Sequence, residues 1–233
     1  MFRAAKAGHA GTLDPLASGL LLVLFGEATK FATFLLDTDK TYLASVHLGI
    51  TTSTGDAEGE VTARRAVSVS EPQVEAALSR FRGTISQVPP MYSALKVGGQ
   101  PLYALAREGL SVERRPREVV IHELELISLQ GDRLALRVRC SKGTYVRTLA
   151  EDIGAALGTG AHLAGLRRTS AGRLSVDDAT GLQALEGMSA TERESRLLPL
   201  DALLEGQVAK RYIFFRDAER NTQRRNLGKA NPV

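Results

Sequence analysis

One carboxylate stands out in the N-terminal part of this chain. Residues 8–19, GHAGTLDPLASG, surround Asp14 with glycines and place Pro15 directly after it. Glycine permits unusual backbone angles and close approach of a partner, and proline biases the preceding residue away from the helical region. An ionised carboxylate held in this way can act as a nucleophile or a base. An Asp-Pro step is also a good helix start, with the aspartate as N-cap, and both interpretations stay open.

An arginine in an unfavourable place is the second candidate. Apolar spacing predicts a helix over residues 145–157, with Val146 and Leu149 facing inward. Arg147 falls in its first turn, where the helix macrodipole disfavours a cation by about 0.3–1 kcal/mol. A bidentate pair with a buried carboxylate explains such an arginine. A side chain that extends back to water explains it equally well.

An aromatic residue is the third candidate. The alternating pattern of residues 40–49 predicts a strand with Tyr42, Ala44, Val46 and Leu48 on one face. The ordinary interpretation of Tyr42 is a core aromatic. The four histidines and the single cysteine, Cys140, share no metal-ligand spacing, so the sequence predicts no metal site.

The elements that must position these residues follow from periodicity and turn signals. They indicate strands over 19–26 and 40–49, helices over 27–40, 70–83 and 145–157, a turn-rich loop over 51–61, and a hairpin over 117–140 turning at 130–132. Residues 85–110 read as irregular, with a turn at 98–99 and a helix after it. Residues 159–179 read as a mixed loop, followed by polar helices to about residue 204. Because strands and helices lack regular βαβ spacing, we expect an α+β fold.

Composition bounds the class of protein. The chain has 233 residues, 43% of them hydrophobic, and a net charge of +4. No apolar run approaches the roughly 20 residues of a transmembrane helix, and no signal peptide is visible. A single cysteine excludes an intrachain disulfide and suits a reducing compartment, so we expect a cytoplasmic protein.

The positive charge is clustered. Arg114, Arg115 and Arg117 form one group, residues 167, 168 and 173 form a second, and the C-terminal stretch is also basic. Clusters of this kind favour a polyanion, most often nucleic acid, as the partner. Solvated surface arginines are the alternative.

Several separate motifs, taken together, carry a family resemblance. GHAGTLDPLASGLL with GEATKF, then KTYLASVHLG, TSTGDAEGE, PPMYSALKVGGQPLYALAREG, CSKGTYVRTLAEDIGAALG and AHLAGLRRTSAG resemble, in this order, the TruB family of tRNA pseudouridine synthases, bacterial type. The resemblance covers about residues 7–204. It implies a pseudouridine synthase fold with a central mixed, mostly antiparallel sheet, flanking helices and RNA-binding loops. The expected organisation is a catalytic domain over 1–204 lacking its first strand, and over 205–233 a basic tail or a remnant of a PUA-like domain.

The resemblance also implies an activity and a site. The family isomerises the T-loop uridine at tRNA position 55 without metal or organic cofactor. Asp14 matches the essential aspartate, Tyr42 the active-site tyrosine and Arg147 the arginine paired with the aspartate. The implied partner is the T arm of tRNA, with no membrane or protein partner and a monomeric state. The implied substrate-binding residues are His9, Lys30, Asp56, Lys96, Arg107 and Leu166.

Two other functions remain to be weighed against this one. The chain can be a non-catalytic RNA-binding or RNA-folding module that keeps the same RNA-clasping loops. It can also be an aspartate-dependent glycosidase, although that class usually needs two carboxylates that flank the bond.

Overall fold

The computed structural model describes residues 2–199, which divide into two compact units. The larger unit comprises residues 3–181 and holds every candidate site residue. The smaller contains two short helices, α5 (Leu182–Gly187) and α6 (Ala190–Ser195). A capping box between Ser189 and Glu192 starts α6, in the polar helical stretch that the sequence predicts. The predicted tail over 205–233 lies outside the described residues.

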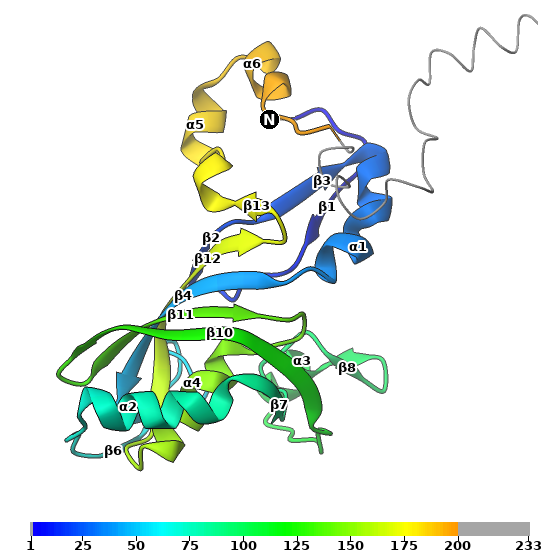
Figure 1. Ribbon diagram of the computed structural model, residues 1–233. Helices are drawn as coiled ribbons and strands as arrows, with labels where there is room; N and C mark the ends of the chain where they lie inside the picture. Colours follow the sequence, from blue (N-terminus) through cyan, green and yellow to red (C-terminus); the bar gives the residue numbers. More distant parts are fainter. Residues whose placement is uncertain (1, 200–233) are drawn as a thin grey trace, which may run out of the picture. The chain divides into compact units, whose positions relative to one another are not determined.

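A seven-stranded sheet organises the larger unit (Figure 1). Its antiparallel order is β13-β12-β4-β11-β10-β7, and β2 adds to β12 in parallel, so the sheet is mixed and mostly antiparallel. The predicted hairpin over 117–140 is confirmed as the β10–β11 pair. The strands are β2 (Ala17–Gly19), β4 (Lys40–Leu48), β7 (Gly83–Gln87), β10 (Arg117–Gln130), β11 (Arg133–Cys140), β12 (Ala161–Ala171) and β13 (Leu174–Ser175).

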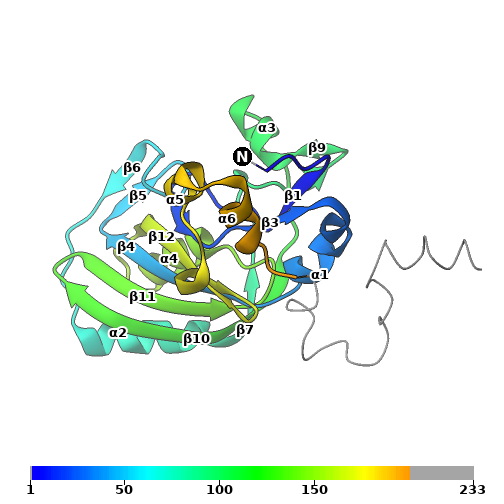
Figure 2. The ribbon, with the colours of Figure 1, turned by 90° about the horizontal axis from the view of Figure 1, so that it is seen from above.

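The core lies between one face of this sheet and two helices, α2 (Glu71–Leu78) and α4 (Val146–Ala156) (Figure 2). Both helices agree with the predicted apolar spacing. Alternate residues of each strand face the core because side chains of a strand point to opposite faces in turn. The buried cluster includes Val46, Leu48, Val74, Leu78, Ile121, Leu134, Leu136, Val138, Leu149 and Ile153.

The opposite face of the β10–β11 hairpin carries charge instead. Arg137 Nε lies 3.3 Å from Glu125 Oε2, and Arg139 Nη1 lies 3.0 Å from Glu123 Oε1. These are cross-strand pairs of opposite sign, the arrangement that stabilises an exposed sheet face. The arginines of this face are therefore neutralised by neighbours on the next strand.

The prediction of a loop over residues 159–179 is wrong, because residues 161–171 form β12, an inner strand of the sheet. Register shifts between Leu163 and Gly165 and between Arg168 and Ser170 mark irregularities in its pairing with β4. Each shift moves the following side chains to the other face, so the sequence loses the two-residue period by which a strand is recognised.

The predicted helix over 27–40 is shorter than expected. A 3₁₀ helix, η1 (Gly26–Phe31), leads into α1 (Ala32–Leu36), and Lys40 already belongs to β4. The buried Lys40 ammonium donates to the carbonyls of Leu36 at 2.6 Å and Thr38 at 2.5 Å. A cation that binds the last carbonyls ends the helix there.

Three small strand pairs complete this unit. β1 (Ala7–Ala10) pairs with β3 (Leu22–Phe25), and β5 (Ile50–Thr52) pairs with β6 (Val61–Arg64). The predicted turn at 98–99 joins β8 (Lys96–Val97) to β9 (Gln100–Pro101), and α3 (Leu102–Arg107) follows. Within residues 2–199, no helix has the length and apolarity that a membrane crossing requires.

We predict that Gly154→Ala destabilises the protein, although alanine normally stabilises a helix interior by about 0.5–1 kcal/mol relative to glycine. A Cβ at Gly154 would lie 2.4 Å from the Cβ of Ala161 on β12, so α4 must move away from the sheet. Overpacking of this kind costs about 1–3 kcal/mol, measured by urea unfolding. Ala155→Gly at the neighbouring exposed position is the control. Its free energy of unfolding should fall only by the difference in helix propensity between alanine and glycine. An unchanged or raised unfolding midpoint for Gly154→Ala would contradict this packing.

Candidate active site

An ion pair joins the two charged candidates. Arg147 Nη2 donates to Asp14 Oδ2 at 3.0 Å, from α4 to the loop between β1 and β2. The arginine side chain is 5% exposed, whereas the side chain of Asp14 is 37% exposed. The interpretation of Arg147 as a side chain that extends to water is therefore wrong. No helix follows Asp14 either: its carbonyl closes a turn to Ala17 N, and β2 begins there, so the N-cap interpretation is also wrong.

Arg147 is anchored by more than one partner. Nη2 also donates to Tyr92 O at 2.9 Å, and Nη1 donates to Thr54 O at 3.2 Å and lies 3.1 Å from Asp56 Oδ2. Each terminal amino group thus has one carbonyl and one carboxylate. A planar guanidinium held at both ends cannot rotate freely, so it fixes the direction from which Asp14 is approached.

Asp56 is itself positioned by its loop. Its Oδ1 accepts hydrogen bonds from Thr54 Oγ1 at 2.5 Å and Glu58 N at 3.1 Å. Backbone hydrogen bonds with Leu163 dock this loop on β12: Leu163 N donates to Gly55 O, and Ala57 N donates to Leu163 O. The buried carboxylate therefore has partners for both oxygens, as a buried charge requires.

A second arginine, which the sequence analysis placed in a basic surface cluster, is buried. Arg168 on β12 donates from Nε to Leu20 O at 2.7 Å and from Nη2 to Gly11 O at 3.0 Å. It spans the loop that carries Asp14 and holds both of its ends. The interpretation as a solvated surface arginine is therefore wrong for this residue, which is 1% exposed. Its burial follows from the place of β12 inside the sheet, and Gly19 lets the loop run close to the backbone of this strand, since a Cβ there would lie 2.2 Å from Arg168 O.

Tyr42 lies beside this arginine, in register with Arg168 on the adjacent strand. Burial raises the pKa of the Tyr42 phenol, and the nearby charge of Arg168 opposes the rise only in part. The hydroxyl is therefore protonated at neutral pH. The ring is partly exposed to the same cavity as Asp14 and offers it a flat aromatic surface.

The electrostatics of Asp14 combine opposing effects. Burial raises the pKa of its carboxyl above the ordinary value, the Arg147 guanidinium lowers it, and the negative charge of Asp56 raises it again. The net direction is upward even though an ion pair is present. Arg147 is shared between two carboxylates, and we attribute the incomplete compensation to this sharing.

These groups face one cavity of ≈ 870 Å³ that is open to solvent. A volume of this order lies within the usual range for small-ligand sites. The cavity brings together six predicted site residues: Asp14, Tyr42, Asp56, Arg107, Arg147 and Leu166. His9, Lys30 and Lys96 lie on exposed positions and do not line it: His9 on β1, Lys30 in an ion pair with Glu27, and Lys96 on β8.

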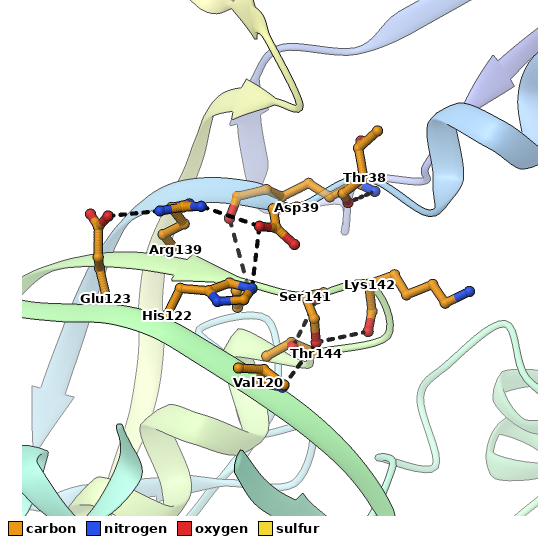
Figure 3. Close-up of polar contacts among 11 residues, drawn as sticks. Thr38, Asp39, Val120, His122, Glu123, Arg139, Ser141, Lys142 and Thr144 are labelled. Atoms are coloured by element: carbon orange, nitrogen blue, oxygen red, sulfur yellow. Dashed lines mark hydrogen bonds and ion pairs between the residues drawn. The ribbon is translucent and has the colours of Figure 1, made fainter. Parts of the chain in front are cut away.

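Polar contacts gather where β4 begins and β11 ends (Figure 3), next to residues 141–144, which line the cavity. Asp39, just before β4, accepts from Arg139 Nη2 at 3.4 Å, and its Oδ2 lies 3.2 Å from His122 Nε2. Ser141, just after β11, accepts from Val120 N at 2.9 Å. These contacts join the strand of Tyr42 to the loop that leads into α4 and Arg147.

Lys142, which lines the cavity, has its Nζ 2.9 Å from Asp37 Oδ1, and both side chains are largely exposed. An exposed pair contributes little to stability, so this ammonium can exchange partners readily. Among residues 2–199, no three His, Cys, Asp or Glu side chains are arranged to bind a metal ion.

Comparison with known proteins places this geometry in a family. The family model described as "TruB family pseudouridylate synthase (N terminal domain)" matches residues 1–146, and "tRNA pseudouridylate synthase B C-terminal domain" matches residues 147–205. The chain is 59% identical over 204 residues to tRNA pseudouridine synthase B of Azoarcus sp. (strain BH72), covering 88% of this chain and 68% of the relative. It is 56% identical over 205 residues to the protein of the same name from Dechloromonas aromatica (strain RCB), covering 88% and 69%.

Solved structures agree with this assignment. A chain in the crystal structure of a Cbf5-Nop10-Gar1 complex superposes with a TM-score of 0.65 at 29% identity, covering 85% of this chain and 53% of that one. A chain of an H/ACA RNP bound to a substrate RNA containing 2'-deoxyuridine gives 0.61 at 27% identity, covering 85% and 51%. The expected α+β pseudouridine synthase fold is thereby confirmed. The chain belongs to the TruB family of tRNA pseudouridine synthases, isomerases that convert uridine to pseudouridine.

Proposed function

We propose that this protein isomerises the uridine at position 55 in the T loop of tRNA, and that Asp14 supplies the reacting carboxylate without a cofactor. The observation that carries the proposal is a partly exposed carboxylate in an open cavity, aimed by a buried guanidinium at 3.0 Å. Arg147, Asp56 and Arg168 hold the reacting group, and Tyr42 and Leu166 form the walls beside it.

The reaction needs few functional groups. The N1–C1′ bond breaks, the uracil turns, a C5–C1′ bond forms, the C5 proton is released and N1 gains a proton. The nucleotide must first leave its stack, at a cost of a few kcal/mol. An ionised Asp14 can react with the freed nucleoside, while Tyr42 supplies an aromatic face of the kind on which extruded RNA bases stack.

Binding of the T arm requires contacts beyond the cavity. The β8–β9 turn and α3 present Lys96 and Arg107 at exposed positions, and Arg107 lies 5.5 Å from the centre of the Tyr103 ring. Arg107 also lines the cavity, so α3 connects the reacting centre to this projecting turn. We assign these residues to phosphate contacts with the T arm. The site needs no second protein chain, so we expect a monomer to be active.

The domain organisation is part of the proposal. We assign residues 1–204 to the catalytic domain, and residues 205–233 to a basic tail or a remnant of a PUA-like RNA-binding domain.

We expect Asp14→Asn to abolish the release of tritium from C5-labelled uridine in a T-arm substrate, while RNA affinity stays within about threefold. The substitution keeps the shape and removes the reacting charge. Asp14→Glu moves the carboxylate by about 1 Å and should lower kcat roughly a hundredfold. Asp132→Asn, on the distant hairpin turn, is the control. Wild-type release by Asp14→Asn would refute the role of Asp14.

The ionised state of Asp14 should also reduce stability. Because the pKa of Asp14 is raised in the folded protein, the folded state binds the proton more tightly than the unfolded state. The contribution of this group to stability therefore falls as pH rises through the window between the two pKa values. We expect Asp14→Asn to unfold at a urea concentration equal to or above that of wild type at pH 7. The acidic limb of the wild-type kcat profile should lie above the ordinary aspartate pKa of about 3.9. A lower midpoint for the variant would contradict this sign.

Salt dependence tests the binding surface. Lys96→Ala and Arg107→Ala should each raise the Kd for T-arm RNA and reduce the slope of log Kd against log salt by about 1, since each removes one phosphate contact. Arg137→Ala is the control because that arginine is paired with Glu125 on the opposite sheet face. Equal slopes for all three variants and wild type would exclude these contacts.

A non-catalytic RNA-folding module is the second candidate, favoured by the projecting basic turn alone. It predicts salt-sensitive tRNA binding and refolding that Asp14→Asn leaves unchanged, with no tritium release from any variant.

A further inference from the structure

A carboxylate that the proposed reaction does not use lies behind the Arg147 network. Glu151 is on α4, four residues after Arg147, so the two side chains lie on the same face of the helix. Its side chain is half-buried. Within residues 2–199 it makes no hydrogen bond or ion pair by the usual distance criteria, unlike Asp14 and Asp56.

The site of this carboxylate is shaped by a glycine. A Cβ at Gly55 would lie 2.7 Å from Glu151 Cδ and within 2.9 Å of both carboxylate oxygens. Gly55 has a φ of +75°, which other residues rarely adopt. The carboxylate therefore fills the volume that a side chain at position 55 would take. Gly55 directly precedes Asp56, whose carboxylate is held against Arg147.

Charged groups surround the carboxyl of Glu151, so its ionisation affects the neighbouring residues of the site. The charged groups that act on Glu151 are Asp152 and Arg147 on α4 and Asp56 on the loop. Burial and the two negative neighbours raise the pKa of Glu151, and Arg147 lowers it. Arg147 Nε, meanwhile, is buried without a hydrogen-bond acceptor among the described residues. The guanidinium is thus anchored at its two terminal nitrogens, whereas its Nε donor has no acceptor among the described residues.

We propose that Glu151 is a positioning residue for the isomerisation. Packed on Gly55, it holds the turn over residues 53–56 against Arg147, and its charge adds to the field in which Arg147 faces Asp14. It is not among the residues that line the cavity, and it acts through Asp56 and Arg147. This inference rests on the proposed role of Asp14 in catalysis.

The two contributions are separable by substitution. Glu151→Ala removes the group that packs on Gly55 and lets the turn relax, so Arg147 loses its fixed direction. A misplacement of about 1 Å can cost up to a hundredfold in rate, and we expect kcat to fall about ten- to a hundredfold with KM for tRNA within twofold of wild type. Glu151→Gln keeps the shape and removes the charge. The field at Asp14 then becomes more positive, so the acidic limb of the kcat profile should move to lower pH.

The neighbouring acid provides a matched control. Asp152 is the next residue on α4, is also half-buried, and has a pKa raised by burial alone. We expect Asp152→Ala and Asp152→Asn to keep kcat within twofold of wild type and to give pH profiles that superpose on it. All variants are compared by tritium release under multiple turnover from pH 4 to 8, with circular dichroism and thermal unfolding to establish that each is folded at the assay temperature and at each pH.

The possible results distinguish a positioning role of Glu151 from a purely structural one. Reduced kcat for Glu151→Ala with unchanged KM, together with a shifted limb for Glu151→Gln, supports the proposal. Glu151 variants indistinguishable from the Asp152 variants overturn it. If Glu151→Ala is unfolded at the assay temperature, the Glu151→Gln profile alone decides. Asp14→Asn is assayed in parallel. Tritium release by that variant refutes the proposed function itself. If Asp14→Asn is inactive but the Glu151 variants have wild-type activity, only this inference is refuted.

Discussion

The structure depends on keeping one buried positive charge satisfied. The Arg147 guanidinium is almost fully withdrawn from water, and burial of a cation is costly unless charged and hydrogen-bonding partners surround it. Those partners come from three separate segments: the loop of Asp14, the turn of Asp56, and the carbonyl of Tyr92. The arginine therefore links three loops at one point, in addition to the contacts that two of them make with β12. The cavity is the space that remains between them.

Two arginines hold Asp14 in place through different contacts. Arg147 contacts the carboxylate itself, whereas Arg168 binds the backbone at the two ends of the loop that carries it. Arg147 therefore orients the carboxylate, and Arg168 fixes the path of the backbone that carries it. This division explains how a flexible, glycine-rich segment can present a carboxylate at a fixed place without a helix or strand beneath it. It also leaves the loop surface free for a ligand.

The elements with regular hydrophobic periodicity could be predicted from the sequence. The helices α2 and α4 and the β10–β11 hairpin keep regular apolar spacing, so their faces can be read directly. It failed at β12, where register shifts erase the two-residue period. The burial of Arg168 could not be predicted without that strand, because an arginine next to another arginine is typical of a solvated surface. The contact between Asp14 and Arg147 was indicated by an arginine placed against its helix dipole, but its partner came from the family resemblance. Glu151 gives no signal in sequence, since its position relative to Gly55 is set only by how α4 packs.

The contacts that fix the Asp14 loop span most of the catalytic unit: 133 residues separate Asp14 from Arg147, and 157 separate Gly11 from Arg168. Closing loops of that length is entropically slow compared with forming helices and hairpins. The carboxylate of Asp14 is therefore synthesised early, well before the residues that hold it in place. During translation it stays without its guanidinium partners until β12 has emerged and entered the sheet, so a nascent chain short of that strand holds the residue but not the geometry.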